Sequence, residues 1–133
     1  MKTFKILMII GVLSIGLFSF TKLVQEEWKV PAKYQNMENP TEASKDNLAD
    51  GKALYVKHCR SCHGKEGYGD GQKADEVEGD LGDFSSEEFQ AQTDGALFYK
   101  SYIGRDDMPN YEKKIPDEDD IWYIVSYLRT LAE

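Results

Sequence analysis

Apolar residues near the end of the chain recur with a helical period. Ile121, Ile124, Val125 and Leu128 repeat at intervals of three and four residues, which places them on one face of a helix. The acidic residues 117–120 precede this stripe, where negative charge stabilises a helix N-terminus. The pattern predicts a C-terminal helix that buries its apolar face.

Three earlier segments also predict helices. A period of 3.6 residues runs from Leu48 to His58 after good capping residues such as Ser44, and this helix should end at the cysteines. Residues 85–95 contain a plausible helix start, and residues 96–103 predict a short helix closed by Gly104. No alternating strand pattern occurs, so the predicted fold is all-α.

The first twenty residues differ from the rest of the chain. Lys2 and Lys5 precede a run of fifteen mostly apolar residues, 6–20, which is typical of an export signal. The run is close to the ~17 residues needed to cross a bilayer, so cleavage as a signal peptide and retention as a membrane anchor both stay open. The distribution of lysines keeps the N-terminus cytoplasmic and exports the remainder.

Composition divides the exported part into a lead-in and a domain. Residues 21–43 predict an irregular lead-in, because Pro31 and Pro40 prevent a continuous helix. Trp28, Val30 and Tyr34 offer apolar anchors by which it could pack on the domain, residues 44–133.

The net charge argues against nucleic acid as a partner. The chain carries −8, and residues 1–20 hold two lysines and no acidic residue, so the exported part carries −10. This acidity is consistent with simple solubility, or with a face that docks on a basic partner.

The stretch His58-Cys59-Arg60-Ser61-Cys62-His63-Gly64 contains both cysteines and both histidines of the chain. A disulfide between residues so close would constrain the unfolded chain little, and a thioredoxin-type pair needs a βαβ setting. A tetrahedral zinc site would need ligands elsewhere. The remaining interpretation of C-x-x-C-H in an exported protein is covalent haem attachment.

That interpretation assigns a role to each residue. The thiols of Cys59 and Cys62 add across the two haem vinyl groups as thioethers, and the imidazole of His63 becomes the proximal iron ligand. The glycine-rich residues 64–82 contain few apolar side chains, so a flat apolar haem would supply the core that they lack.

The sequence resembles the monohaem class I c-type cytochromes, especially bacterial periplasmic or membrane-tethered members. Gly51 and Tyr55 stand where the family's first helix crosses its last, and residues 127–129 resemble the segment of the last helix at that crossing. The G-x-G-D-G of residues 67–71 and the lead-in of residues 28–40 also resemble family features. The resemblance implies a cytochrome c fold, a small helical domain wrapped around one haem, exported to the periplasm.

The resemblance and the chemistry agree on the distal ligand. Met108 is the only methionine after the haem motif, and the family's distal ligand is typically a methionine followed by proline, as Pro109 follows here. Family members often have a proline near the motif whose region orients the proximal histidine, but this chain has none between Pro40 and Pro109. We therefore expect a backbone carbonyl of residues 79–82 to orient His63.

Four other side chains are candidates for the walls of the haem site or for contacts with its propionates. They are Arg105, Tyr111, Trp122 and Tyr123.

The expected function is one-electron transfer by a single haem c with His63 and Met108 as axial ligands. With both positions filled, no site is open to a substrate, so we expect no catalytic residue and no enzyme activity. A redox donor and acceptor are the expected partners, including a membrane oxidoreductase complex of a respiratory chain, with residues 1–20 as a candidate tether. A haem subunit of a larger membrane complex is an alternative, and a gas sensor with an open iron is another.

Overall fold

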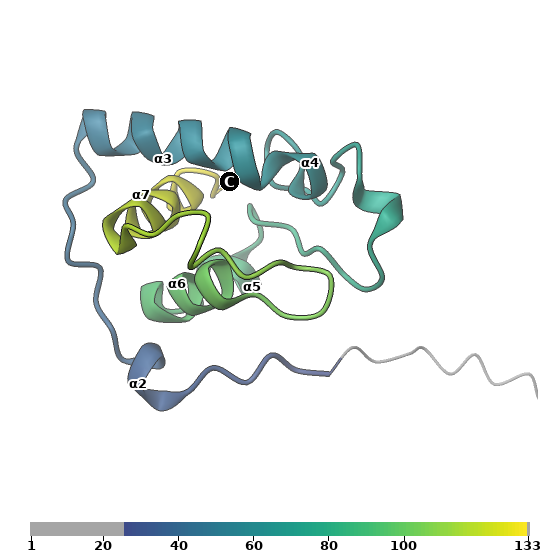
Figure 1. The fold of residues 1–133 in the computed structure, drawn as a ribbon, viewed down its shortest axis with the longest axis horizontal. Coiled ribbons are helices and arrows are strands. Elements are labelled where there is room, and N and C mark those ends of the chain that lie inside the picture. Colours follow the sequence, from purple (N-terminus) through teal and green to yellow (C-terminus); the bar gives the residue numbers. More distant parts are fainter. Residues whose placement is uncertain (1–25, 133) are drawn as a thin grey trace, which may run out of the picture.

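The computed structural model describes residues 26–132, and the predicted export segment, residues 1–20, lies outside them. Within the described residues the chain is helical and contains no strand, only an isolated bridge between Arg105 and Met108. The all-α prediction is therefore confirmed. The elements in chain order are α2 (Ala32–Gln35), α3 (Lys45–His58), α4 (Arg60–His63), η1 (Ala74–Glu76), α5 (Glu87–Gln90), α6 (Asp94–Ile103) and α7 (Glu118–Arg129) (Figure 1).

The two longest helices, α3 and α7, cross at Gly51. A Cβ atom at this position would lie 2.1 Å from the carbonyl oxygen of Tyr123, so the two backbones approach as closely as glycine allows. One turn further along α3, Tyr55 is fully buried, and its ring lies 5.3 Å from that of Tyr127 on α7. This confirms the predicted crossing of the first long helix with the last.

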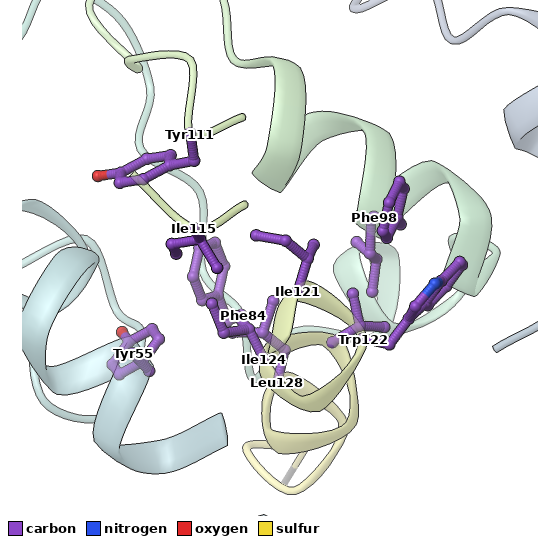
Figure 2. Close-up of a cluster of buried hydrophobic side chains, with 11 residues drawn as sticks. Tyr55, Phe84, Phe98, Tyr111, Ile115, Ile121, Trp122, Ile124 and Leu128 are labelled. Atoms are coloured by element: carbon purple, nitrogen blue, oxygen red, sulfur yellow. The ribbon is translucent and has the colours of Figure 1, made fainter. Parts of the chain in front are cut away.

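The apolar stripe of α7 faces the core, as its period predicts. Ile121, Ile124, Val125 and Leu128 are all buried (Figure 2). On the α6 side, the rings of Phe98 and Trp122 stack with centroids 4.3 Å apart. The helix begins after Asp117, whose side chain accepts a hydrogen bond from the backbone amide of Asp119.

The lead-in is more ordered than the sequence predicts. Pro31 stops a longer helix but is compatible with the single turn of α2, because a helix N-terminus needs no amide there. This turn packs on α6, where Thr93 donates a hydrogen bond to the carbonyl of Gln35 (2.9 Å) and the rings of Tyr34 and Tyr99 lie 4.7 Å apart. The lead-in is thus fixed to the domain.

Two helix starts differ from the prediction. The segment beginning at Ser85 forms only the short α5, capped by Ser86. Helix α6 starts at Asp94, two residues before the predicted start, with Thr93 as its cap. The second residue of α6 must be a glycine, Gly95, because a Cβ atom at this position would lie 1.9 Å from the carbonyl oxygen of Tyr34.

Candidate functional site

The C-x-x-C-H motif occupies one helical turn at the end of α3. Cys59 ends α3 and begins α4, and its carbonyl accepts hydrogen bonds from the amides of Cys62 (3.2 Å) and His63 (3.0 Å). Both cysteines are free, half-buried thiols. Burial, and then the neighbouring Cys62, raise the pKa of Cys59 to about 12, so this thiol is neutral at physiological pH.

The glycine-rich loop after the motif folds back on it. The amide of Gly69 donates to the carbonyl of His63 (2.9 Å), and that of Gly71 donates to the carbonyl of Cys62 (3.1 Å). A Cβ atom at Gly71 would lie 2.3 Å from the carbonyl oxygen of Ser61, so only glycine permits this approach. These bonds satisfy the carbonyls at the end of α4 and fix its orientation.

The His63 imidazole lies among aromatic rings. Its centroid is 4.6 Å from that of Phe84, which in turn stacks on Phe89 at 4.4 Å. Burial lowers the pKa of His63, and the backbone of Leu81 partly opposes this shift. The buried Nδ1 atom has no hydrogen-bond partner, so the Leu81 contact falls short of hydrogen-bond geometry. At neutral pH the imidazole is therefore neutral and carries a lone pair that can bind a metal ion.

Leu81 belongs to the segment 79–82 that the sequence predicts as the acceptor for His63. The neighbourhood is as predicted, although the hydrogen bond itself is not formed among the described residues.

Met108 lies in a tight loop between α6 and α7. Gly104 ends α6 with a φ of 69°, and a Cβ atom there would lie 2.3 Å from the carbonyl oxygen of Met108. Asp106 also has a positive φ, 51°, and the amide of Met108 donates to the carbonyl of Arg105 (2.8 Å). This turn leaves the Met108 side chain half-buried.

One cavity of about 290 Å³ joins the predicted site residues, near the lower end of the ~300–1,000 Å³ usual for small-molecule sites. Cys59, Cys62, His63 and Met108 all line it. Its other walls are largely aliphatic and aromatic, and include Val77, Leu81, Phe84, Phe89, Leu97 and Leu128.

The four additional candidates separate into two pairs. Arg105 and Tyr111 line the cavity, and the Tyr111 hydroxyl donates to the carbonyl of His58 (2.8 Å), which ties the segment after Met108 to the end of α3. Trp122 instead stacks in the core (Figure 2), and the backbone of Tyr123 meets Gly51.

Sequence reasoning missed Trp28 and Lys100, which also line the cavity. Lys100 lies one turn before Gly104 on α6, and that spacing could have placed it near the Met108 loop. Trp28 was expected only as an apolar anchor of the lead-in, and nothing in its sequence position points to the cavity.

Comparison with known proteins identifies the domain. Residues 46–128 match the sequence model of the family "Cytochrome C oxidase, cbb3-type, subunit III". The chain belongs to this family of c-type cytochrome domains. The match begins in α3 and ends in α7, so it includes the cavity residues that these helices and their connections supply.

A solved structure has a similar fold. The chain is 27% identical to a chain of the Kuenenia stuttgartiensis reducing HAO-like protein complex Kustc0457/Kustc0458, with a TM-score of 0.62. The similarity covers 82% of this chain and 52% of that chain, so this cytochrome spans about half the length of its structural neighbour. A search of curated proteins finds no match.

A c-type cytochrome domain implies a haem, and the cavity suits one chemically. The neutral imidazole of His63 could bind iron through Nε2, while its buried Nδ1 is left for an orienting backbone carbonyl. The two free thiols lie on the same turn. The apolar walls match a flat apolar ring system, and Lys100 and Arg105 in the lining would be the candidates to pair with its carboxylates. The family therefore implies haem-based electron transfer.

Proposed function

We propose that this cytochrome carries single electrons by means of one haem c, covalently bound at Cys59 and Cys62 and held by His63 and Met108 as axial ligands. The observation that carries the proposal is that all four side chains line one cavity, although Met108 is 45 residues from His63 in the sequence. When bound, the haem iron supplies the redox chemistry by alternating between Fe(III) and Fe(II).

The protein's own residues bind and tune this group. Thioethers at Cys59 and Cys62 would keep the haem attached in both oxidation states. The Met108 thioether is a soft, neutral donor, which favours Fe(II) and raises the reduction potential. Phe84, Leu97 and Leu128, which line the cavity, would shield a bound haem from water. Two occupied axial positions leave no site for a substrate, which is why we propose a carrier and not an enzyme.

A role as one haem subunit of a larger oxidoreductase complex is the second candidate. It is favoured by the structural neighbour, which belongs to a protein complex, and by a family name that denotes an oxidase subunit. In either role the partners are redox proteins, a donor and an acceptor. Residues 1–20 would export the domain to the periplasm, as a soluble protein or as one anchored to the inner membrane. None of the helices in residues 26–132 has the length and hydrophobicity to cross a bilayer.

Covalent attachment is tested by extraction. We expect acid-acetone treatment of the purified protein to leave the haem on the polypeptide, with the α-band of a bis-thioether haem in the pyridine haemochrome spectrum. Cys59→Ala and Cys62→Ala single variants should each shift that band, because one vinyl group then remains free. Complete extraction of the haem from the unmutated protein would contradict the proposal.

The distal ligand is tested by spectroscopy of Met108 variants. The unmutated ferric protein should show the weak red absorption of a sulfur-to-iron charge transfer. Met108→Ala should remove this band, admit carbon monoxide to the reduced iron and lower the reduction potential. Met108→His should also lower the potential but exclude carbon monoxide, which separates loss of the thioether from loss of the fold. If the unmutated reduced protein binds carbon monoxide readily, the gas-sensor alternative replaces the carrier.

A further inference from the structure

Trp28, in the lead-in, lies at the cavity and contacts the loop that carries Met108. The Arg105 guanidinium lies over its ring, with Cζ 4.6 Å from the centroid, and Lys100 Nζ lies 5.7 Å from the same centroid. Arg105 Nη1 also donates to the carbonyl of Glu26 (2.9 Å). All three side chains, Trp28, Lys100 and Arg105, line the cavity.

Arg105 has no other partner of comparable strength among the described residues. Its Nε atom lies 3.5 Å from Asp106, but that carboxylate is 76% exposed, so water screens the pair. The Arg105 side chain is itself only 26% exposed, and partial removal from water strengthens a cation–π contact. Among the contacts of Arg105 with the described part of the protein, those with the lead-in therefore dominate.

Arg105 is connected directly to Met108. The two residues form an antiparallel bridge, in which the Met108 amide donates to the Arg105 carbonyl (2.8 Å). A displacement of Arg105 therefore displaces the Met108 backbone. The loop has a second attachment immediately before Met108, where Asp107 accepts a hydrogen bond from the amide of Glu78 (2.9 Å).

The lead-in is a fixed support for this contact. Besides the Thr93 bond to Gln35, Asn39 donates to the hydroxyl of Ser126 on α7 (2.9 Å) and to the carbonyl of Trp122 (3.4 Å). The segment that presents Trp28 is thus attached to both α6 and α7. Trp28 lies on the chain that leads into this attached part, and its own ring contacts are with Lys100 and Arg105.

We propose that Trp28 and Arg105 are positioning residues that hold the Met108 loop closed over the cavity and thereby limit the replacement of the Met108 thioether by an external ligand. The inference rests on the proposed function, in which Met108 binds the iron. An external ligand can bind only when the loop opens, so its apparent affinity is reduced by the small population of open molecules. Weakening the Trp28–Arg105 contact raises that population.

The test is imidazole binding to the ferric holoprotein, followed by loss of the sulfur-to-iron band. Trp28→Ala and Arg105→Gln should each increase the apparent imidazole affinity about 3- to 10-fold, as expected for removal of a partly buried cation–π contact. Trp28→Phe, which keeps an aromatic face, should restore most of the unmutated value. The control is Lys29→Ala, because Lys29 is adjacent but 86% exposed and its ion pair with Glu26 lies in water.

Amide hydrogen exchange gives a second measurement that needs no added ligand. Trp28→Ala should increase exchange at the Met108 amide while leaving the amides of α3 unchanged. If Trp28→Ala destroys the sulfur-to-iron band altogether and Trp28→Phe restores it, the proposal is supported.

Three results would overturn it. Imidazole affinity and Met108 exchange that are unchanged in Trp28→Ala would refute the positioning role while Met108 ligation stands. An equal effect of Lys29→Ala would assign the change to the lead-in in general. Absence of the band in the unmutated protein would refute Met108 ligation, and with it the positioning role.

Discussion

Substitution of Gly51 by alanine sets two effects of opposite sign against each other. In the interior of an isolated helix, alanine is more favourable than glycine by roughly 1 kcal/mol. In this fold, however, the new Cβ atom would lie 2.1 Å from the Tyr123 carbonyl oxygen and 2.5 Å from its carbon. Both contacts are with backbone atoms, which cannot move away by changing rotamer.

The structure decides which effect dominates. Ordinary van der Waals contact requires about 3.5 Å, so α3 and α7 would have to separate by more than ~1 Å along their contact. Overpacking of this kind costs ~1–3 kcal/mol, and a backbone clash lies at the upper end of that range. Subtracting the gain in helix propensity leaves a net loss of about 2 kcal/mol, or ~8–16 °C in Tm for a domain of this size.

Thermal unfolding of the holoprotein, followed by far-UV circular dichroism, measures this difference. Ala53→Gly is the matched control, because Ala53 lies on the same helix but is exposed. It should lose only the propensity term, about 1 kcal/mol. A Gly51→Ala variant that melts at or above the unmutated protein would refute the close crossing of α3 and α7.

Two further predictions concern the C-terminal helix and the charged surface. Arg129→Lys should lower the free energy of unfolding by ~1.5–3 kcal/mol, because the guanidinium donates to the carbonyls of Gln90 (2.7 Å) and Gln92 (2.6 Å) and a lysine cannot reproduce that geometry. A urea unfolding curve identical to that of the unmutated protein would contradict this prediction. Electron exchange with a basic redox protein, measured by stopped flow, should slow between low salt and ~0.15 M, where the Debye length is ~8 Å. Asp106→Asn, at the cavity, should weaken this salt dependence, whereas Asp119→Asn, at the start of α7, should leave it unchanged. If the two variants change the salt dependence equally, the docking face is not at the cavity.

Local signals predicted the elements whose determinants are close together in sequence. The stripe of α7 needs only the period of its apolar residues, and the C-x-x-C-H motif is contained in one turn. The crossing at Gly51 was predicted from the family resemblance, and the structure gives its physical cause in the Tyr123 carbonyl. The Met108 loop was anticipated because Gly104 marks the end of α6.

What the sequence did not reveal depends on contacts between distant segments. The early start of α6 requires a glycine inside a helix, which propensity disfavours, and the reason is the approach of the Tyr34 carbonyl. The role of Trp28 depends on a cation about 80 residues away, and a ring–cation contact leaves no periodic pattern. Trp122 was expected as a candidate wall of the cavity, but the stacking partner Phe98 holds it in the core.

The segment 77–82 connects the two predicted axial ligands. Leu81 lines the cavity together with His63, while the Glu78 amide donates a hydrogen bond to Asp107, the residue before Met108. Gly79 and Gly82 have φ values of 101° and 72°, so this loop adopts a backbone path that other residues would resist. Its conformation therefore affects the surroundings of both residues, His63 and Met108. This chain lacks the proline that family members often have near the motif. Here the loop of residues 77–82, with its two glycines of positive φ, lines the cavity and binds Asp107, and these contacts order a segment that has few apolar residues.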